Sequence, residues 1–390
     1  MIKILFTTPE LEHPPASGPT LRVESYIKAL AKISDLHVIS RVNKQRMGGP
    51  QAEAFYVKLS AGFGYAPSAT ANLPGGGVRE DAIAIVRYAD HHKINIIWFG
   101  FGNISHQLMK TIKTHRPDLK IICDTDSVWS RFLLRELPFE ASPERCAAIE
   151  REGRQKEHEE ADFVNYCDVT TAVSEVDAEY YRGLATDPSK VHIFSNVIDL
   201  DNYAHQAPPE GFKRPCLYLA GRFYAMTSPM ARSARWIINE VLPGLSRLIP
   251  DVHLYIIGNG ASECLSDVHQ PNVSVVGKVK SVLPYLCNAS VSLVPLMFES
   301  GTRFKIMEAG ACNVPIVSTT LGAEGIPVTD GEHLLFADTP EAFIEATARI
   351  IQDSVLGARL AKNCRLLIEQ HYGLAQLSRE GVEILQYLDA

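Results

Sequence analysis

The chain has 390 residues, a length that suits two α/β domains of ordinary size. Hydrophobic residues make up 46% and charged residues 21%, which supplies two cores and excludes a disordered protein. The formal net charge of -7 argues against a general nucleic-acid-binding protein, which needs a basic surface to hold phosphates.

The N-terminus and the cysteines favour a cytoplasmic protein. The first expected strand, residues 2–9, is interrupted by proline too soon for a secretion signal, and no apolar run reaches the ~18 residues of a membrane-spanning helix. The eight cysteines show no C-x-x-C pair and no zinc-like histidine spacing, so we interpret them as reduced core residues. We expect a cytoplasmic location, with contact to a membrane surface neither required nor excluded.

In the first half, short apolar runs alternate with helical patterns, which predicts a parallel sheet. The segment 47–80 is rich in glycine, proline and small residues, and we predict a mobile loop around a single strand there. A loop of that length is more often functional than idle. The expected strands are 2–9, 36–42, 95–102, 119–125, 169–174 and 192–197.

A polar, proline-bearing stretch at 201–215 precedes a second series of strands and helices. We therefore predict a first domain over 1–205 and a second over 206–371, with a C-terminal helix at 372–390 that packs back on the first domain. Helices are expected at 234–250 and 340–353, for example. The second series of strands is expected at 216–222, 253–260, 273–279, 291–296, 314–320 and 333–338.

The most informative stretch is 298–325, in which a strand end runs through a glycine into a helix. Arg303 and Lys305 are predicted in the first turn of that helix, where the helix dipole disfavours cations, so an anion should offset them. A diphosphate on the free N–H groups of the helix end would do so. Glu308 lies in an apolar run and needs partners, which two ribose hydroxyls would supply. The alternative is a set of ion pairs on the helix surface.

Nearly the whole second half resembles the retaining glycosyltransferases of the GT-B fold, in the large group called glycosyl transferases group 1. The motifs follow the order of that family: AGRF at 220–223, YIIGNG at 255–260, VVGKV at 275–279, SLVPL at 292–296, GTRFKIMEAGACNVPIVST at 301–319 and DGEHLLFADTPEAF at 330–343. The residues of the fifth motif resemble a branch of the family that has a GTRxKxxE donor motif. The resemblance implies an α/β fold of two Rossmann-like domains whose parallel sheets face an interdomain cleft.

The resemblance also implies roles for single residues. Glu308 matches the second of two family glutamates, on the nucleotide ribose, whereas Ser300 stands where the first, near the sugar, is expected. Arg222 matches an arginine after the first strand of the second domain. The lysine that follows it in the family is absent, and we hypothesise that Lys305 supplies its charge. Asp126, at the carboxyl end of a strand, is matched to a family histidine that faces the sugar. The alternative is that an aspartate there caps the following helix.

Glycine turns complete the predicted site. Gly18 is expected to cap a helix, with Arg22 in its first turn reaching the donor diphosphate, and a plain loop cap is the alternative. Gly258 and Gly260 would let the backbone approach a base or ribose. The predicted catalytic residues are Asp126, Arg222 and Lys305. The predicted donor-binding residues are Gly18, Arg22, Gly221, Arg222, Gly258, Gly260, Ser300, Gly301, Thr302, Arg303, Lys305 and Glu308.

The reaction that the resemblance implies is transfer of a sugar from a nucleotide-diphosphate sugar to an acceptor hydroxyl, with retention at the anomeric carbon, as in glycan biosynthesis. Arg222, Arg303 and Lys305 would stabilise the leaving diphosphate. We expect no metal and no cofactor. The expected partners are the nucleotide-sugar donor and an acceptor sugar, glycan, lipid-linked molecule or protein, which the sequence does not identify.

Two other functions remain open. A nucleotide-sugar epimerase would use the same fold but needs acid and base residues that converge on the sugar. A non-catalytic sugar-nucleotide-binding protein is favoured by Ser300 and by the absent lysine, and turnover of the donor would exclude it. A dinucleotide oxidoreductase is disfavoured, because G-x-G-x-x-G is missing after the first strand and GNGASE at 258–263 lacks the third glycine.

Overall fold

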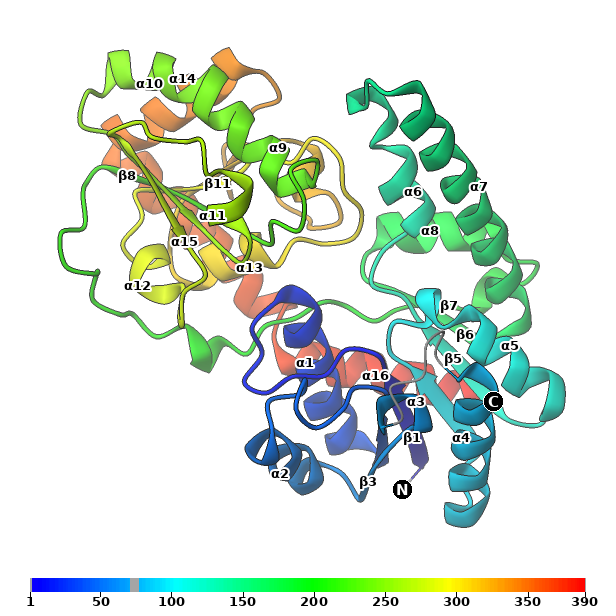
Figure 1. Cartoon of the computed structure of the whole chain (residues 1–390). Coiled ribbons are helices and arrows are strands. Elements are labelled where there is room, and N and C mark those ends of the chain that lie inside the picture. Colours follow the sequence, from blue (N-terminus) through cyan, green and yellow to red (C-terminus); the bar gives the residue numbers. More distant parts are fainter. Residues whose placement is uncertain (1, 71–76, 390) are drawn as a thin grey trace. The chain divides into compact units, whose positions relative to one another are not determined.

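The computed structural model describes residues 2–70 and 77–389, which form two compact units (Figure 1). The first unit consists of Met1–Ile198 and Leu374–Ala390, and the second of Asp199–Gly373. The predicted boundaries lay at 205/206 and 371/372, and the units divide at 198/199 and 373/374. Within the described residues, no helix combines the length and the apolarity needed to cross a membrane.

The first unit contains a parallel sheet with the strand order β3-β2-β1-β4-β5-β6-β7. Most of its strand residues are buried, and apolar side chains lie on both faces, as expected for a parallel sheet covered by helices. The six strands predicted in this half are confirmed. The bounds are β1 (Lys3–Thr8), β2 (Asp35–Ser40), β3 (Gly62–Tyr65), β4 (Ile96–Phe99), β5 (Lys120–Asp124), β6 (Val169–Ala172) and β7 (Val191–Ile193).

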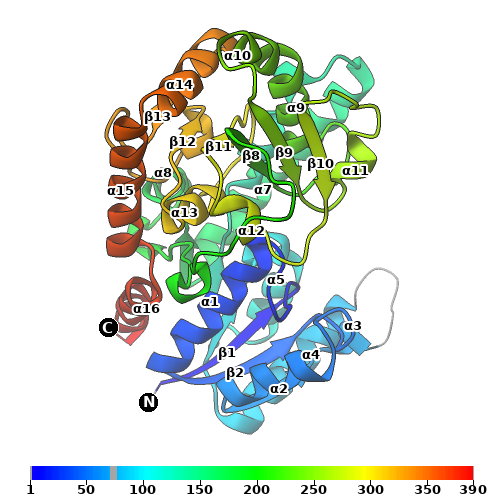
Figure 2. The ribbon, with the colours of Figure 1, turned by 90° about the vertical axis from the view of Figure 1, so that its left-hand side faces the viewer.

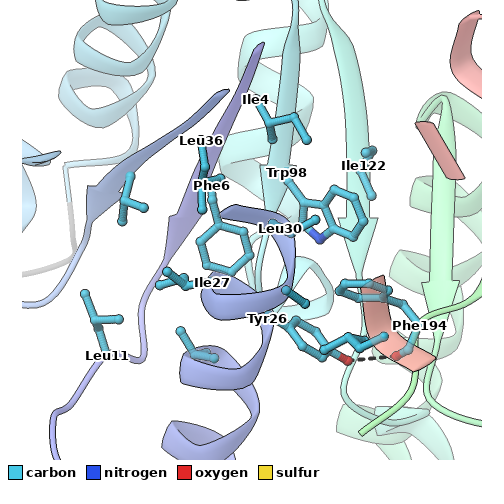
Figure 3. Packing of buried hydrophobic residues seen from close by; sticks show 14 of the residues in the cluster. Ile4, Phe6, Leu11, Tyr26, Ile27, Leu30, Leu36, Trp98, Ile122 and Phe194 are labelled. Carbon is cyan, nitrogen blue, oxygen red and sulfur yellow. Dashed lines mark hydrogen bonds between the residues drawn. The ribbon is translucent and has the colours of Figure 1, made fainter. Parts of the chain in front are cut away.

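The helices of the first unit enclose two apolar clusters, one on each face of the sheet. In one of them Phe6 and Trp98 of the sheet pack against α1, and the Tyr26 hydroxyl donates to the Phe194 carbonyl at 2.7 Å (Figure 3). The C-terminal helix α16 (Leu374–Asp389) belongs to the same cluster. The other helices are α1 (Gly18–Ile33), α2 (Pro50–Leu59), α3 (Pro67–Thr70), α4 (Val78–His92), α5 (His106–His115), α6 (Trp129–Leu134), α7 (Pro143–Tyr166) and α8 (Glu175–Leu184).

The predicted loop over 47–80 is wrong in part, because α2 occupies 50–59. Pro50 opens that helix, and the buried Tyr56 anchors it by donating its hydroxyl to the Glu12 carbonyl at 2.9 Å. The single strand expected within the segment is β3, followed by the short α3. Residues 71–76 of the segment lie outside the described residues.

The second unit contains a parallel sheet with the order β10-β9-β8-β11-β12-β13, and all six predicted strands are confirmed (Figure 2). The strands are β8 (Cys216–Ala220), β9 (His253–Ile257), β10 (Val273–Gly277), β11 (Val291–Val294), β12 (Ile316–Ser318) and β13 (Leu335–Phe336). The helices are α9 (Pro229–Trp236), α10 (Leu242–Leu248), α11 (Ala261–Cys264), α12 (Leu283–Leu286), α13 (Phe304–Ala311), α14 (Pro340–Gln352) and α15 (Ser354–His371).

The helix predicted at 234–250 differs from the structure in two respects. It begins earlier, at Pro229, after Ser228 as N-cap. It is also interrupted by a π-helical turn at Ile237–Val241, directly before Pro243 in α10. Proline lacks an N–H for the regular helical pattern, which accounts for an irregular turn at this place.

Candidate functional site

The loops that follow β8 and β9 meet at the carboxyl edge of the second sheet. The backbone N–H of Gly221 donates to the Ile257 carbonyl at 3.1 Å, and that of Phe223 donates to the Asn259 carbonyl at 2.9 Å. Ligands of open α/β sheets bind outside this edge, because the strand ends and the helix starts converge there. The two loops therefore form one wall of the candidate site.

Gly258 and Gly260 make this close approach possible. Their φ angles are +144° and +80°, and a Cβ atom would lie 1.7 Å from the Gly221 carbonyl oxygen or 1.9 Å from that of Phe223. No other residue fits either position without moving the neighbouring loop. The sequence predicted that these glycines approach a base or ribose, whereas the structure assigns them to the contact between the two loops.

A third loop at this edge leads from β11 into α13, and residues 300–303 are its last part. Gly301 has a φ of +80°, and Ser300, Thr302 and Arg303 are buried. Arg303 is the N-cap residue of α13 and does not lie in its first turn, which corrects the prediction. Its guanidinium donates to the Ser300 carbonyl at 2.6 Å and to the Gly301 carbonyl. Arg303 thus fixes the backbone of the loop.

Lys305 lies in the first turn of α13 and is half-buried. Its ammonium group contacts the Met230 sulfur at 3.1 Å. The Met230 side chain also fills the space beside Gly221, where a Cβ would lie 2.7 Å from its Cγ. Lys305 therefore reaches from α13 to the start of α9, and Met230 links it to the loop after β8. Burial lowers the pKa of Lys305 to about 8, against the opposing effect of Glu299.

Glu308 lies one turn further along α13 and is also half-buried. The Tyr203 hydroxyl donates to its Oε1 atom at 3.1 Å. Burial raises the pKa of Glu308 to about 7, although Tyr203 and Lys305 both stabilise the ionised form. Within the described part of the chain Lys305 and Glu308 form no ion pair, so the surface pairing considered as the alternative is not observed for them.

Arg222 follows Gly221 in the loop after β8. Its side chain is exposed and, over residues 2–70 and 77–389, makes no hydrogen bond or ion pair. Tyr224 and Met226 in the same loop are 60% and 63% exposed. A solvated guanidinium beside two exposed, largely apolar side chains is an arrangement that a charged organic ligand can cover.

The starts of two helices adjoin these side chains. The Ser228 side chain accepts from the Ala231 N–H at the start of α9, and α13 starts beside Lys305. Free N–H groups at helix starts favour anions. The structure thus assembles Gly221, Arg222, Lys305 and the loop 300–303 at one edge, with Met230 between them. Met230 and Tyr203 were missed from the sequence, although the Ser228-Pro229 pair is a recognisable helix start.

In the first unit, the structure gives Arg22 an internal role. Its side chain is 1% exposed and donates to Asp124 Oδ1 at 2.7 Å, to the Thr125 carbonyl at 2.6 Å and to Asn196 Oδ1 at 3.1 Å. Burial raises the pKa of Asp124 to about 6 despite this arginine. The predicted diphosphate contact would require Arg22 to abandon these partners.

The helix that carries Arg22 is capped by Ser17, so the expected cap at Gly18 is wrong. Gly18 is instead the first helical residue. The Ser17 N–H donates to the Thr20 hydroxyl at 3.1 Å, and the two hydroxyl groups lie 3.1 Å apart. Side-chain capping of this kind satisfies the orphan N–H groups at the helix start.

Asp126 follows β5 at the carboxyl edge of the first sheet. Its Oδ1 atom accepts hydrogen bonds from the Asn103 amide at 2.7 Å and the Trp129 indole at 3.1 Å. The carboxylate is only partly buried. The N-cap of the following helix α6 is Val128, so the alternative that Asp126 caps it is not observed.

Solved structures share this fold over the whole chain. HepE of Anabaena, in complex with UDP and glucose, has a TM-score of 0.70 at 13% identity and covers 99% of this chain and 100% of its own. Sucrose-phosphate synthase of Thermosynechococcus elongatus has a TM-score of 0.72 at 14% identity, and the match covers 100% of this chain and 99% of the synthase. WaaG, a glycosyltransferase involved in lipopolysaccharide biosynthesis, has a TM-score of 0.65 at 13% identity, and the match covers 98% of this chain and 99% of WaaG. The fold is therefore that of the GT-B glycosyltransferases, with two Rossmann-like α/β domains.

Part of the sequence also matches a family model. Residues 214–353 match the family described as "Glycosyl transferases group 1", and the match lies within the second unit. Among curated proteins, no sequence matches the chain significantly. The matched residues include the loops at residues 221–223 and 300–308 of the second unit.

Proposed function

We propose that the chain is a glycosyltransferase that takes a sugar from a nucleotide-diphosphate donor bound at the carboxyl edge of the second sheet. The observation that carries the proposal is the contact of Lys305, at the start of α13, with Met230 at the start of α9, next to Gly221, which Arg222 directly follows in the chain. Two cations and two helix starts suit a diphosphate, whose charge grows when the sugar leaves. The complex of HepE with UDP and glucose makes UDP the first nucleotide to test.

Each side chain of the site has a part in this proposal. Lys305 and Arg222 hold the diphosphate and stabilise it as a leaving group. Glu308 accepts hydrogen bonds from the ribose hydroxyls. These hydroxyls replace the water that a half-buried carboxylate would otherwise need as a hydrogen-bond donor. Arg303 acts indirectly, because it keeps the loop 300–303 in shape. Asp126, at the edge of the first sheet, stays the proposed sugar-contacting residue.

The chemistry that we propose is metal-independent transfer with retention. The bond between the anomeric carbon and the phosphate oxygen breaks, and the acceptor oxygen forms a bond to the same carbon on the same face. The departing phosphate takes the proton of the acceptor hydroxyl. Positioned cations lower this barrier because they bind the separating charge more tightly than the intact donor.

Titration calorimetry with UDP tests the site. Arg222→Ala should weaken UDP binding by roughly 10-fold, since one charged hydrogen bond contributes about 1.5 kcal/mol. Arg247→Ala is the matched control, because Arg247 is an exposed arginine on α10, away from the site. Equal UDP affinity in both variants would contradict the diphosphate site.

A second measurement concerns turnover. The full chain is incubated with UDP-glucose without acceptor, and slow release of UDP is followed over hours, with Lys305→Met as the comparison. Release that depends on Lys305 supports a transferase. Tight UDP binding with no turnover of a panel of nucleotide sugars would favour a non-catalytic binding protein.

A further inference from the structure

Two cysteine sulfurs of the second unit lie in contact. Cys287 directly follows α12 and Cys312 directly follows α13, and their Sγ atoms are 3.6 Å apart. Both thiols are free in the structure. Because a disulfide bond is about 2.0 Å long, the two sulfurs need to approach by only about 1.5 Å to form one.

The topology of the sheet accounts for this contact. The helix α12 leads into β11 and α13 leads into β12, and these two strands are parallel neighbours. Right-handed crossovers that advance in the same direction lie on the same face of a sheet. The two helices therefore end side by side at the amino edge of the sheet, each with a cysteine as its C-cap residue (Figure 2).

Solvent can reach this pair. Cys287 and Cys312 are both half-buried, and the residue after Cys312, Asn313, is exposed in a left-handed conformation that ends the helix. By contrast, Cys123 and Cys167 also interact through their side chains but are completely buried. The chain thus holds one neighbouring thiol pair that an oxidant can approach and one that is sealed within the first unit.

We propose that Cys287 and Cys312 form a modification site, at which a reversible disulfide is made under oxidising conditions. Each thiol gives up one proton and one electron as the S–S bond forms. With hydrogen peroxide as oxidant, the two electrons break its O–O bond, and with the two protons they yield two molecules of water. A dithiol reductant reverses the step. The proposal does not rest on the transferase function, since the pair lies at the amino edge, away from the loops at the carboxyl edge.

Peptide mapping of the native full chain after hydrogen peroxide treatment tests the site. Burial raises the pKa of the Cys312 thiol, so the treatment is run at mildly alkaline pH, where more thiolate forms. We expect one linked pair of peptides, containing Cys287 and Cys312, whose combined mass is lower by two hydrogen atoms than that of the two reduced peptides. Dithiothreitol should restore the starting mass.

The chain provides its own controls. Cys123 and Cys167 should stay reduced, because proximity without access is not enough. Cys146 is half-buried, and its sulfur contacts the Glu140 carbonyl, so it should be oxidised without forming a link. Either Cys287→Ser or Cys312→Ser should abolish the link, and Cys146→Ser should leave it. Oxidation of Cys146 without any link between Cys287 and Cys312 would overturn the proposal, as would a link from Cys287 to another cysteine.

Discussion

Lys305 combines a positive charge with a half-buried position, and this makes ligand binding sensitive to pH. Its pKa of about 8 lies below that of a solvated lysine because burial disfavours the charged form. Below pH 8 the ammonium group is charged and can bind a diphosphate, and above pH 8 it becomes neutral.

We therefore predict that the affinity for UDP falls as the pH rises from 7 to 9. Lys305→Met should bind UDP roughly 10- to 100-fold more weakly at pH 7, since a charged hydrogen bond contributes about 1.5–3 kcal/mol, and should lose most of the pH dependence. Calorimetric titrations at several pH values measure both effects. A variant that keeps the pH slope of the natural chain would assign the slope to another group.

Glu308 predicts a pH dependence of stability. Its pKa of about 7 in the folded chain exceeds the value near 4.5 of a solvated glutamate, so the folded state holds a proton that the unfolded state has lost. Its contribution to stability is therefore complete below pH 4.5 and declines as the pH rises to about 7.

Glu308→Gln removes this decline and keeps an oxygen for the Tyr203 hydroxyl. We expect the melting temperature of the variant, relative to the natural chain, to rise between pH 5 and pH 8. Thermal unfolding at matched pH values measures this difference. A difference that is constant over that range would mean that Glu308 is ionised throughout.

Residue types could be predicted from the sequence better than residue roles. Lys305 and Glu308 were singled out because charges in an apolar stretch that follows a glycine need partners. The internal partners of Arg22 were not predicted, because Asp124 lies 102 residues away in the chain and only the fold brings the two together. Arg303 stabilises its own loop through hydrogen bonds to the loop carbonyls. This role likewise depends on a backbone conformation that a sequence motif does not specify.

At the level of elements, a buried carboxylate anchors the last helix. Glu380 of α16 accepts from the Ser195 N–H and the Ser195 hydroxyl, both at 2.8 Å. Burial raises the pKa of Glu380, against the stabilising effect of these hydrogen bonds. The pairing joins α16 to the segment after β7 within the first unit.

Glu380→Ala should lower the free energy of unfolding by about 1–3 kcal/mol, because it leaves the buried Ser195 N–H without its acceptor. Glu383→Ala on the exposed side of the same helix is the control and should change stability little. Urea unfolding of both variants makes the comparison. Equal losses would mean that helix propensity, and not the buried hydrogen bonds, decides the effect.

The elements themselves were largely predictable. Among the described residues, twelve strands were located at their own ranges, because buried parallel strands are continuous apolar runs between turn residues, and β3 was expected only as a strand somewhere within 47–80. The helix α2 was not, since Gly48, Gly49 and Pro50 at its start suggested a loop, and only Ala52 and Tyr56 in it are buried. A helix with so small a buried face has little hydrophobic periodicity to recognise.

At the level of the whole molecule, the first unit is assembled from two separate parts of the chain. Leu377, Ile384 and Leu385 of α16 belong to its core cluster, and each such side chain contributes roughly 1.5–3 kcal/mol when buried.

A chain that ends at Gly373 should therefore lose cooperative unfolding of the first unit, while the second unit keeps its affinity for UDP. Circular dichroism melting combined with UDP titration separates the two effects. Loss of UDP binding together with an intact first unit would contradict this division of the chain.

This division also bears on how the protein is made. During synthesis the ribosome releases all of Asp199–Gly373 before the final helix emerges, so the second unit can be finished while the first still lacks α16. The sheet of the first unit is translated earlier, but part of its apolar surface stays exposed until α16 is available to cover it. Nascent chains should accordingly need chaperones most in the interval before α16 leaves the exit tunnel.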